Sequence, residues 1–280
     1  MAITASDVKK LREQTGAGMM DCKKALTEAD GDFAKAEKIL KEMGLAAAAK
    51  RGGRATSEGR IFTYVGSSAA GVLELSSETD FVARNETFVA LGNDLVKKMT
   101  EENLTVDNEA IKEQVVTAVS TIKENISPSR FTRMEFSANE AVCDYIHGEG
   151  GTIGVLIKLQ ADSADALKQD EAKQLHFDLA LHAAAYKPLY LSEKQVEPAY
   201  LEEQKNIFLK QAENMGKPEK VMQGIAAGKL KKHLSEICFV NQGFVKEDKK
   251  SVQQVIDELG KKIGSTVQLT DYIVYSVGQE

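Results

Sequence analysis

Cysteine is scarce in this sequence, with three residues among 280. They lie far apart, at Cys22, Cys143 and Cys238, without the close pairing that zinc sites and redox dithiols use. We therefore expect reduced thiols that act as small apolar core residues, since free cysteine is among the most buried residue types. The odd number leaves an intermolecular disulfide open.

A long hydrophobic run is also absent. The longest uninterrupted apolar run covers residues 45–49, whereas a helix that crosses a bilayer needs about 20 residues. The opening MAITASDVKK has no apolar segment of the kind found in a secretory signal. These features predict a cytoplasmic protein with no membrane partner.

An excess of positive charge is missing as well. The 36 Lys and Arg residues face 42 Asp and Glu residues, which gives a net charge of −6. This balance argues against a protein whose main task is to coat phosphate backbones, so no direct nucleic-acid binding is expected. Basic residues do gather near the Gly-rich segment 46–59, but no aromatic residues lie between them to stack on bases. A solvated hinge is therefore favoured there over an RNA contact.

The motifs that enzymes use to hold phosphates or metals are incomplete here. GIAAGK at 224–229 is one residue short of a phosphate loop and lacks the following Ser or Thr. GEGGTIG at 148–154 has isoleucine where a dinucleotide loop needs its last glycine, so a turn between strands is favoured. His176 and His182 are six residues apart, a poor spacing for two metal ligands on one helix. We predict no catalytic residue, no metal site and no cofactor.

The hydrophobic pattern predicts an α+β protein of two or three packed units. Three short helical stretches fill residues 1–52, separated at Gly16 to Gly18 and at Gly31, and Asp32 is placed to cap the third. Strand patterns and helical patterns then follow one another without strict β–α alternation. The strands are expected at 61–65, 72–75, 131–136, 142–146, 153–159 and 267–277, and the helices at 79–99, 108–122, 171–186 and 252–263.

Two further helical stretches, 195–214 and 218–234, flank the sequence MGKP at 215–218. Glycine suits the position after a helix end and proline suits the first turn of the next helix, which predicts an antiparallel helical hairpin. A projecting hairpin is favoured over one folded into the main core, although a short connection specifies only the antiparallel packing.

The segment TDFVA at 79–83 combines a capping residue with an apolar pair. Thr79 is an acceptable N-cap, Asp80 suits the positive end of a helix dipole, and Phe81 and Val82 fall in the first turn. On these grounds alone an ordinary helix start with Phe81 in its own core is the simpler interpretation, because a sequence does not show which way Phe81 points.

Two motifs resemble the elongation factor Ts family, TGAGMMDCKKAL at 15–26 and TDFVA at 79–83. Their order and spacing also agree with that family, as do the HG pair at 147–148, the IGVLIKL segment that follows it and the helical hairpin. The resemblance covers essentially the whole chain. It implies a ubiquitin-associated-like three-helix domain at 1–52, a linker at 53–59, and a two-part core at 60–140 and 141–280 with the hairpin at 195–234 inserted in the second part.

The resemblance implies a guanine-nucleotide exchange factor that binds the GTPase elongation factor Tu, either with GDP or free of nucleotide. The matching positions are Thr79, Asp80, Phe81 and Val82 beside the partner's magnesium site, and further contacts at Leu11, Met19, Met20, His147 and Gly148. Well-known members carry a further short carboxy-terminal module, and contacts made by that module are not carried over to this sequence. It stays open whether the methionines only fill the three-helix core. It also stays open whether the protein forms a homodimer within a larger complex.

Competing hypotheses come from other classes of protein. The small helical domain and the basic linker would also suit a ubiquitin-associated-like adaptor or an RNA-associated protein. The presence of TDFVA at its expected place argues against both, and a metabolic enzyme comes third.

Overall fold

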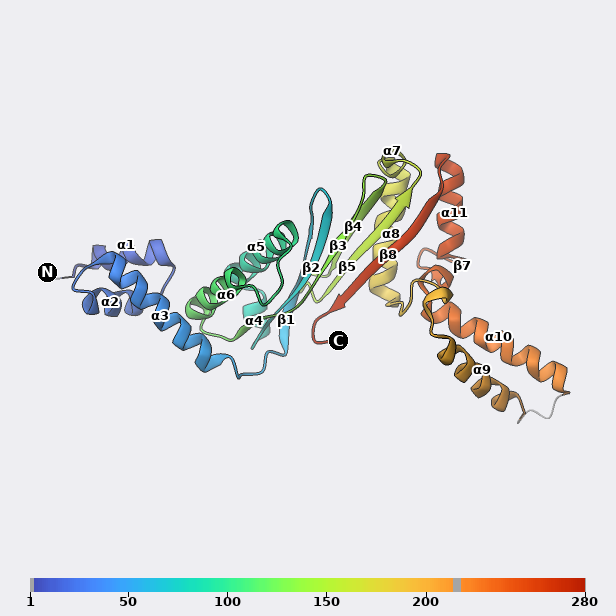
Figure 1. The fold of residues 1–280 in the computed structure, drawn as a ribbon, viewed down its shortest axis with the longest axis horizontal. Helices are drawn as coiled ribbons and strands as arrows, with labels where there is room; N and C mark the ends of the chain where they lie inside the picture. The colour runs from blue at the N-terminus through green and yellow to red at the C-terminus, as the bar shows by residue number, and fades with distance from the viewer. Residues whose placement is uncertain (1–2, 214–217, 280) are drawn as a thin grey trace. The chain divides into compact units, whose positions relative to one another are not determined.

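The computed structural model describes residues 3–213 and 218–279 (Figure 1). They divide into two compact units: unit 1 holds residues 3–134, 146–154 and 275–279, and unit 2 holds 135–145, 155–213 and 218–274. Helices and antiparallel strand pairs occur together, which confirms the predicted α+β class. No helix in the described ranges is both long enough and apolar enough to span a membrane.

Unit 1 begins with the three helices expected there, α1 (Ala5–Thr15), α2 (Met19–Glu28) and α3 (Phe33–Arg51). Asp32 caps α3 as predicted, since its carboxylate accepts a hydrogen bond from the Lys35 backbone N–H at 3.1 Å. The three helices enclose a small apolar core that includes Val8, Leu11, Cys22, Ala25, Leu26, Ala36 and Leu40. α3 runs on to Arg51 and β1 begins at Glu58, so the irregular segment between them covers 52–57.

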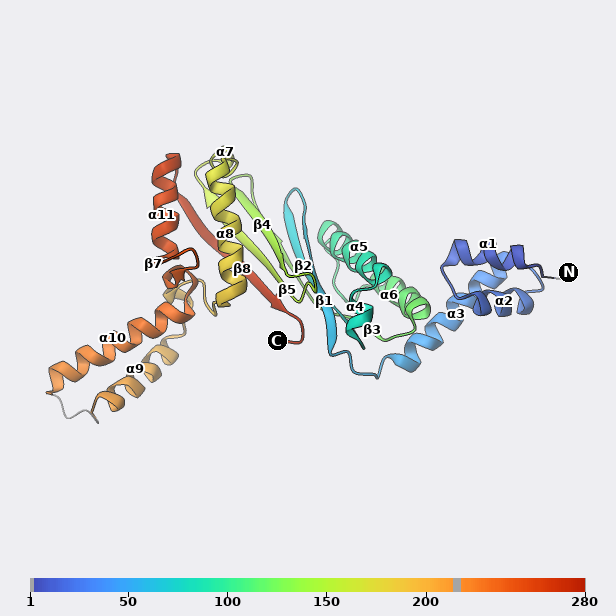
Figure 2. The ribbon, with the colours of Figure 1, turned by 180° about the vertical axis from the view of Figure 1, so that it is seen from behind.

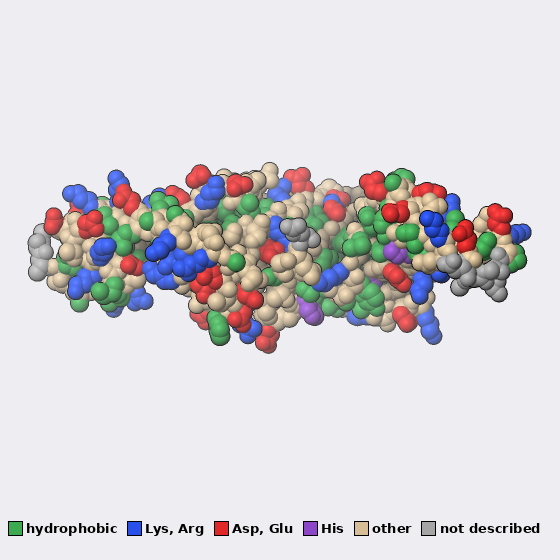
Figure 3. Space-filling view, turned by 90° about the horizontal axis from the view of Figure 1, so that it is seen from below, with side chains coloured by type: hydrophobic (Ala, Val, Ile, Leu, Met, Phe, Trp, Pro, Cys, Tyr) green, Lys and Arg blue, Asp and Glu red, His purple; other side chains and the backbone are tan. Residues whose placement is uncertain are grey.

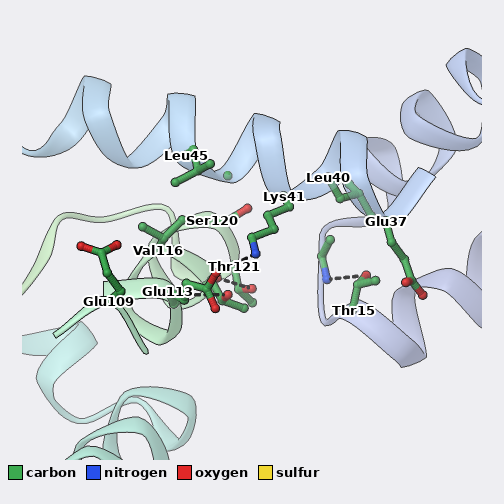
Figure 4. A pocket seen from close by; sticks show the side chains of 13 residues that line it. Thr15, Glu37, Leu40, Lys41, Leu45, Glu109, Glu113, Val116, Ser120 and Thr121 are labelled. Carbon is green, nitrogen blue, oxygen red and sulfur yellow. Dashed lines mark hydrogen bonds and ion pairs between the residues drawn. The ribbon is translucent and has the colours of Figure 1, made fainter. Parts of the chain in front are cut away.

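The second half of α3 packs along α6 (Glu109–Ile122). Gly44 is buried at this crossing, where an added Cβ would lie 3.5 Å from that of Ser120. A cleft of about 470 Å³ remains between the two helices. Figure 4 shows Lys41 reaching from α3 to Glu113 of α6, with 2.7 Å between Nζ and Oε1. The packing ties the three-helix bundle to the rest of unit 1.

The sheet of unit 1 has the order β1 (Glu58–Val65), β2 (Ala69–Ser77), β3 (Ile126–Glu135). β1 and β2 form the predicted antiparallel hairpin, and all nine residues of β2 are buried. α5 (Glu86–Glu102) packs on this hairpin (Figure 2). Its contact depends on Gly92, because a Cβ there would lie 2.2 Å from the ring of Phe62. Glycine in a helix interior costs up to about 1 kcal/mol relative to alanine, and here it admits an aromatic ring.

The single helix predicted for 79–99 is wrong, because the chain forms two helices there. α4 (Asp80–Ala83) is one turn long, and α5 starts at Glu86. Asn85 is the N-cap of α5 and accepts a hydrogen bond from the Thr87 backbone N–H at 2.9 Å. An asparagine side chain that caps a new helix competes with continuation of the previous one.

A buried ion pair joins three segments of unit 1. Arg130 on β3 donates from Nε to the carboxylate of Glu74 on β2 at 2.7 Å, and Glu74 is only 4% exposed. The same guanidinium donates to the Ser276 carbonyl at 2.7 Å and lies over the ring of Tyr275 at 3.9 Å. The Gly278 N–H donates to the other oxygen of Glu74 at 2.9 Å. The pair therefore holds β2, β3 and the end of the chain together.

Unit 2 contains most of a second sheet, with the order β4 (Glu140–His147), β5 (Ile153–Ala161), β8 (Val267–Ser276). α11 keeps its predicted bounds, Val252–Ile263, and α8 (Asp170–Tyr186) begins one residue earlier than predicted. Smaller elements absent from the sequence prediction complete the unit: α7 (Ala164–Leu167), the 3₁₀ turns η1 (Glu193–Gln195) and η2 (Phe239–Asn241), and the short pair β6 (Gly243–Phe244) and β7 (Glu247–Ser251).

The predicted helical hairpin is present as α9 (Pro198–Glu213) and α10 (Glu219–Ile237). Both views show this pair leading away from the sheet of unit 2, which agrees with a projecting hairpin (Figures 1 and 2). Tyr200 of α9 and His233 of α10 are joined by a hydrogen bond of 2.8 Å. The connection predicted at 215–218 falls mostly outside the described residues.

The three cysteines are free thiols. Cys22 and Cys238 are fully buried, as the prediction of apolar core residues requires, while Cys143 on β4 is partly exposed. Burial raises the pKa of Cys143 and Cys238 to about 11. Few of these side chains are therefore in the reactive thiolate form near neutral pH.

Both histidines of α8 are packing residues. His176 is 6% exposed and its Nε2 lies 2.7 Å from the Ile157 carbonyl. His182 lies within stacking distance of Tyr186, Phe239 and Phe244. Its Nδ1 accepts from the Val245 N–H at 3.1 Å, so the proton is on Nε2, which donates to Gln242 at 3.0 Å. Protonation of Nδ1 would break the contact with Val245.

The stability of the protein should fall as the pH is lowered from about 7 to about 5.5. Burial lowers the pKa of His176 from 6.5 to about 4 and also lowers the pKa of His182. The unfolded state then binds more protons than the folded state, and His176 alone should remove about 1 kcal/mol of unfolding free energy over this range. Urea unfolding at each pH measures the effect. His176→Gln should weaken the pH dependence, and an unchanged slope would contradict this account.

Candidate functional site

The TDFVA segment forms α4, a single helical turn that begins where the buried strand β2 ends. Thr79 is its N-cap, as predicted, and its hydroxyl accepts a hydrogen bond from the Val82 N–H at 3.4 Å. Ala83 is buried, and Val82 packs against the core cluster formed by the sheet and helices of unit 1. Two of the residues of this turn thus attach it to the core.

Phe81 points in the opposite direction. It is 82% exposed, so the interpretation of Phe81 as a core residue is wrong. Asp80 beside it forms an ion pair with Arg84, at 3.4 Å between Oδ2 and the guanidinium, and both side chains are largely exposed. The turn therefore exposes an aromatic ring and a carboxylate to solvent, while its backbone is held by the packing of Val82 and Ala83 on the core.

Side chains from distant parts of unit 1 hold this turn in place. Glu124 accepts hydrogen bonds from the hydroxyl of Thr79 at 2.8 Å and from its backbone N–H at 3.1 Å. Glu78 accepts from the Asn125 N–H at 2.7 Å and pairs with Arg54 at 3.3 Å. The bond from Asn125 and the nearby guanidinium hold the pKa of Glu78 below its usual value. Figure 3 shows basic side chains gathered beside acidic ones on the part of unit 1 where α3 ends.

The sequence prediction missed Glu124 and Asn125. Each is more than forty residues from the group that it contacts, 45 residues for the pair Glu124 and Thr79 and 47 for Asn125 and Glu78. No local period or capping pattern carries information over such a distance. α6 ends at Lys123, which adopts the left-handed conformation with φ 70° directly before these two residues.

The three candidates in the amino-terminal helices fall into two groups. Leu11 is fully buried among α1, α2 and α3, so in the free chain its role is packing, and its contact with a partner stays a prediction. Met19 and Met20 are 49% and 75% exposed at the start of α2. The alternative that they fill the three-helix core is therefore wrong, and both thioethers are accessible.

His147 and Gly148 lie where β4 ends and a glycine-rich turn begins, and both are exposed. Gly148 and Gly151 adopt positive φ values, and the Gly151 carbonyl accepts from the Ile61 N–H at 2.8 Å. Segment 148–154 is thus a turn between strands, as predicted, while GIAAGK at 224–229 lies within the helix α10. Neither segment has the strand-to-helix form of a phosphate loop.

These positions have the features of a protein-binding surface. An aromatic ring on a fixed helical turn, two exposed methionines and an exposed turn are typical of contacts with a partner protein. The comparisons with known proteins are more specific. The family model described as Elongation factor TS matches residues 78–279.

Relatives named Elongation factor Ts align over nearly the whole chain. The protein of Borrelia hermsii is 47% identical over 278 residues, 99% of this chain and 100% of its own length. That of Borreliella burgdorferi is 45% identical over 276 residues, and that of Treponema denticola 42% over 278 residues, each covering 99% of both chains. The chain belongs to the elongation factor Ts family and is a translation elongation factor.

Truncation of two phenylalanines that are seven residues apart should affect the stability of the free protein very differently. Phe88→Ala removes a fully buried ring that packs 6.1 Å from that of Phe62, and it should destabilise the free protein by about 3–5 kcal/mol. Phe81→Ala removes an exposed ring and should change stability by less than about 0.5 kcal/mol. Thermal melting of the free proteins measures both. A large melting shift for Phe81→Ala would return this side chain to the core.

Proposed function

We propose that this chain is the guanine-nucleotide exchange factor of elongation factor Tu and promotes release of GDP from that GTPase. The observation that carries the proposal is the display of Phe81 on α4, with its ring 82% exposed above a backbone that is bonded to the core. A rigid aromatic side chain can enter a partner at little cost in conformational entropy. Membership of the elongation factor Ts family supports the assignment.

The proposed mechanism is displacement of the elements that hold magnesium and phosphate in the partner. Mg²⁺ requires near-ideal octahedral coordination, so a small shift of its surroundings weakens its hold on GDP. Thr79, Asp80, Phe81 and Val82 would enter beside that site, with Phe81 as the main apolar contact. By linkage, a factor that lowers nucleotide affinity is itself bound less tightly when nucleotide returns, which allows GTP to displace it.

Asp80 has a partner of its own in the free chain. Its pair with Arg84 is exposed on both sides, so the pair contributes little to stability and is easily exchanged. We infer that Asp80 leaves Arg84 when it meets polar groups of the GTPase. The ion pair then keeps the carboxylate near the tip of α4 until the complex forms.

Two further surfaces complete the proposed contact. Met19 and Met20 would meet the nucleotide-binding domain of the GTPase, and flexible thioethers suit an apolar surface that must adapt. His147 and Gly148 would meet another of its domains. In this proposal residues 1–52 form a ubiquitin-associated-like domain, and the core parts 60–140 and 141–280 carry the other two contacts. The protein would act in the cytoplasm.

The hypothesis of an RNA-associated protein is weakened by the contacts of two basic residues, one at the end of α3 and one just after it. Arg51 donates to the Lys123 carbonyl at 3.0 Å, and Arg54 pairs with Glu78 at 3.3 Å. Guanidinium groups already engaged within the chain would have to leave these partners to bind phosphates. A pull-down that recovers RNA without a translational GTPase would favour that hypothesis.

Small amounts of the protein should accelerate the release of labelled GDP from elongation factor Tu. Phe81→Ala should lose roughly 2 kcal/mol or more of interaction with the GTPase, as expected of an aromatic anchor. Asp80→Ala should affect the same step and combine non-additively with Phe81→Ala, because the two neighbours enter one site. Release rates over a series of factor concentrations measure these effects.

Phe177→Ala serves as the matched control for this experiment. It removes another ring with a large exposed fraction, 41%, from α8 in unit 2, where the ring packs edge-on against Tyr145, and it should leave the release rate unchanged. Stoichiometric binding of labelled GDP by the chain alone would contradict the proposed mechanism, and so would full activity of Phe81→Ala.

Removal of residues 1–52 should weaken binding to the GTPase while the remaining chain stays folded. The loss has two separable causes, since the deletion removes both Met19 with Met20 and the half of α3 that packs on α6. A full-length chain with Met19→Ser and Met20→Ser removes only the first. Circular dichroism and complex affinity should show folded proteins with reduced affinity in both cases. Global unfolding of the truncated chain would show that this domain is integral to the core.

A further inference from the structure

The helical turn that carries Phe81 is too short to be stable by itself. α4 has four residues, and an isolated helix of this length does not form in water because nucleation is unfavourable. Its position must therefore come from contacts outside the turn. Within the described residues, Glu124 supplies the polar contacts that reach Thr79 from outside its own segment, at 2.8 Å and 3.1 Å.

Glu124 belongs to a three-residue turn, Lys123 to Asn125, that joins α6 to β3. Asn125 is 9% exposed and donates two hydrogen bonds, from the backbone N–H to Glu78 at 2.7 Å and from the side-chain amide to the Arg54 carbonyl at 2.8 Å. Consecutive residues of the turn thus hold consecutive residues of the segment that leads into α4. Three hydrogen bonds fix this crossing, and the fourth joins Asn125 to the Arg54 carbonyl.

The other side of the same turn is bonded to the amino-terminal helices. Lys123 forms an ion pair with Asp21 of α2 at 2.9 Å, and its carbonyl accepts from Arg51 of α3 at 3.0 Å. Asp21 directly follows Met19 and Met20 in the chain. The turn at 123–125 therefore contacts both elements that carry the proposed apolar contacts, α2 and α4.

We propose that Glu124 is a positioning residue for nucleotide exchange, which holds Thr79 so that Phe81 is presented at a fixed place, and that the turn 123–125 sets α4 relative to α2. This inference rests on the function proposed above. Glu124 acts through Thr79 and does not itself meet the nucleotide. A carboxylate suits the task because it accepts hydrogen bonds from both donors of one residue, and such charge-assisted bonds are stronger than neutral ones.

The first test measures the position of residue 81 in the free protein. The sequence contains no tryptophan, so Phe81→Trp introduces a single fluorophore at the tip of α4. Adding Glu124→Ala should lower the fluorescence anisotropy of that tryptophan, because the turn loses its anchor and moves more freely. The far-ultraviolet circular dichroism should stay the same. Unchanged anisotropy would overturn the proposal.

Glu140→Ala is the matched control. Glu140 accepts from both the hydroxyl and the backbone N–H of Ser137, at 2.8 Å and 2.7 Å, so it holds the same two kinds of donor as Glu124 holds on Thr79, although on one carboxylate oxygen. It belongs to unit 2, whereas α4 belongs to unit 1. This variant should leave the anisotropy at position 81 and the exchange rate unchanged. An equal loss from Glu140→Ala would mean that the effect of Glu124→Ala is a general one.

The second test follows GDP release from elongation factor Tu. Glu124→Ala should slow the accelerated release about tenfold, equivalent to about 1.4 kcal/mol, and should have no further effect when Phe81→Ala is already present. Glu124→Gln should restore most of the rate, since its amide can accept from the Thr79 N–H and donate to the hydroxyl. If Glu124→Gln restores the anisotropy at position 81 but not the release rate, the charge of Glu124 and not its positioning role is what matters, and the proposal fails.

The two tests separate this inference from the proposed function. If Phe81→Ala leaves exchange intact, the function proposed for α4 is wrong whatever Glu124 does. If Phe81→Ala impairs exchange and Glu124→Ala lowers the anisotropy without slowing release, the proposed function stands and the positioning role of Glu124 is overturned.

Discussion

The ion pair between Glu74 and Arg130 governs the arrangement of unit 1. Both groups are largely withdrawn from water, which is costly unless their hydrogen-bonding capacity is met. Here Arg130 also meets a backbone carbonyl near the end of the chain, and Glu74 meets a backbone N–H there. Because the pair is satisfied only when β2, β3 and the last segment adopt one relative position, it selects a single register. α4 begins three residues after β2 ends, so the same constraint sets its origin.

The candidate site follows this fixed strand, and its neighbouring side chains point in opposite directions. Val82 and Ala83 face inward and Phe81 faces outward within a single turn, while Glu124 closes the amino end at Thr79. Each device is small, yet together they place a large exposed ring on a backbone with little freedom. The function proposed for the chain needs no acid, base or nucleophile, since weakening the coordination of a magnesium ion in a partner requires only displacement.

Local signals in the sequence predicted much of the fold. Asp32 and Thr79 were recognised as caps because a short polar side chain just before an apolar period has few other roles, and α11 followed its amphipathic pattern to both ends. The sequence analysis missed the position where a side-chain cap competes with continuation of a helix. Asn85 starts a new helix inside a continuous helical pattern, and only the backbone shows that its side chain caps α5.

The candidate site was predictable only in part. TDFVA was found through its resemblance to a family, but the outward direction of Phe81 and the burial of Leu11 depend on packing that a single sequence does not reveal. Glu124 gave no signal because its contact with Thr79 is made across 45 residues. Such long-range contacts follow from the tertiary fold and not from any pattern of spacing.

The preformed conformation of α4 has a consequence for the rates of association and dissociation. This turn is already folded and bonded to the core before any partner arrives, so association does not wait for a segment to order itself, and dissociation does not require one to unfold. Binding segments that fold on contact lose part of their interaction energy to that ordering. A preformed tip instead lets the lifetime of the complex depend on the contacts alone, and these change when nucleotide returns. In the proposed role this suits a factor that must leave one GTPase molecule and act on the next.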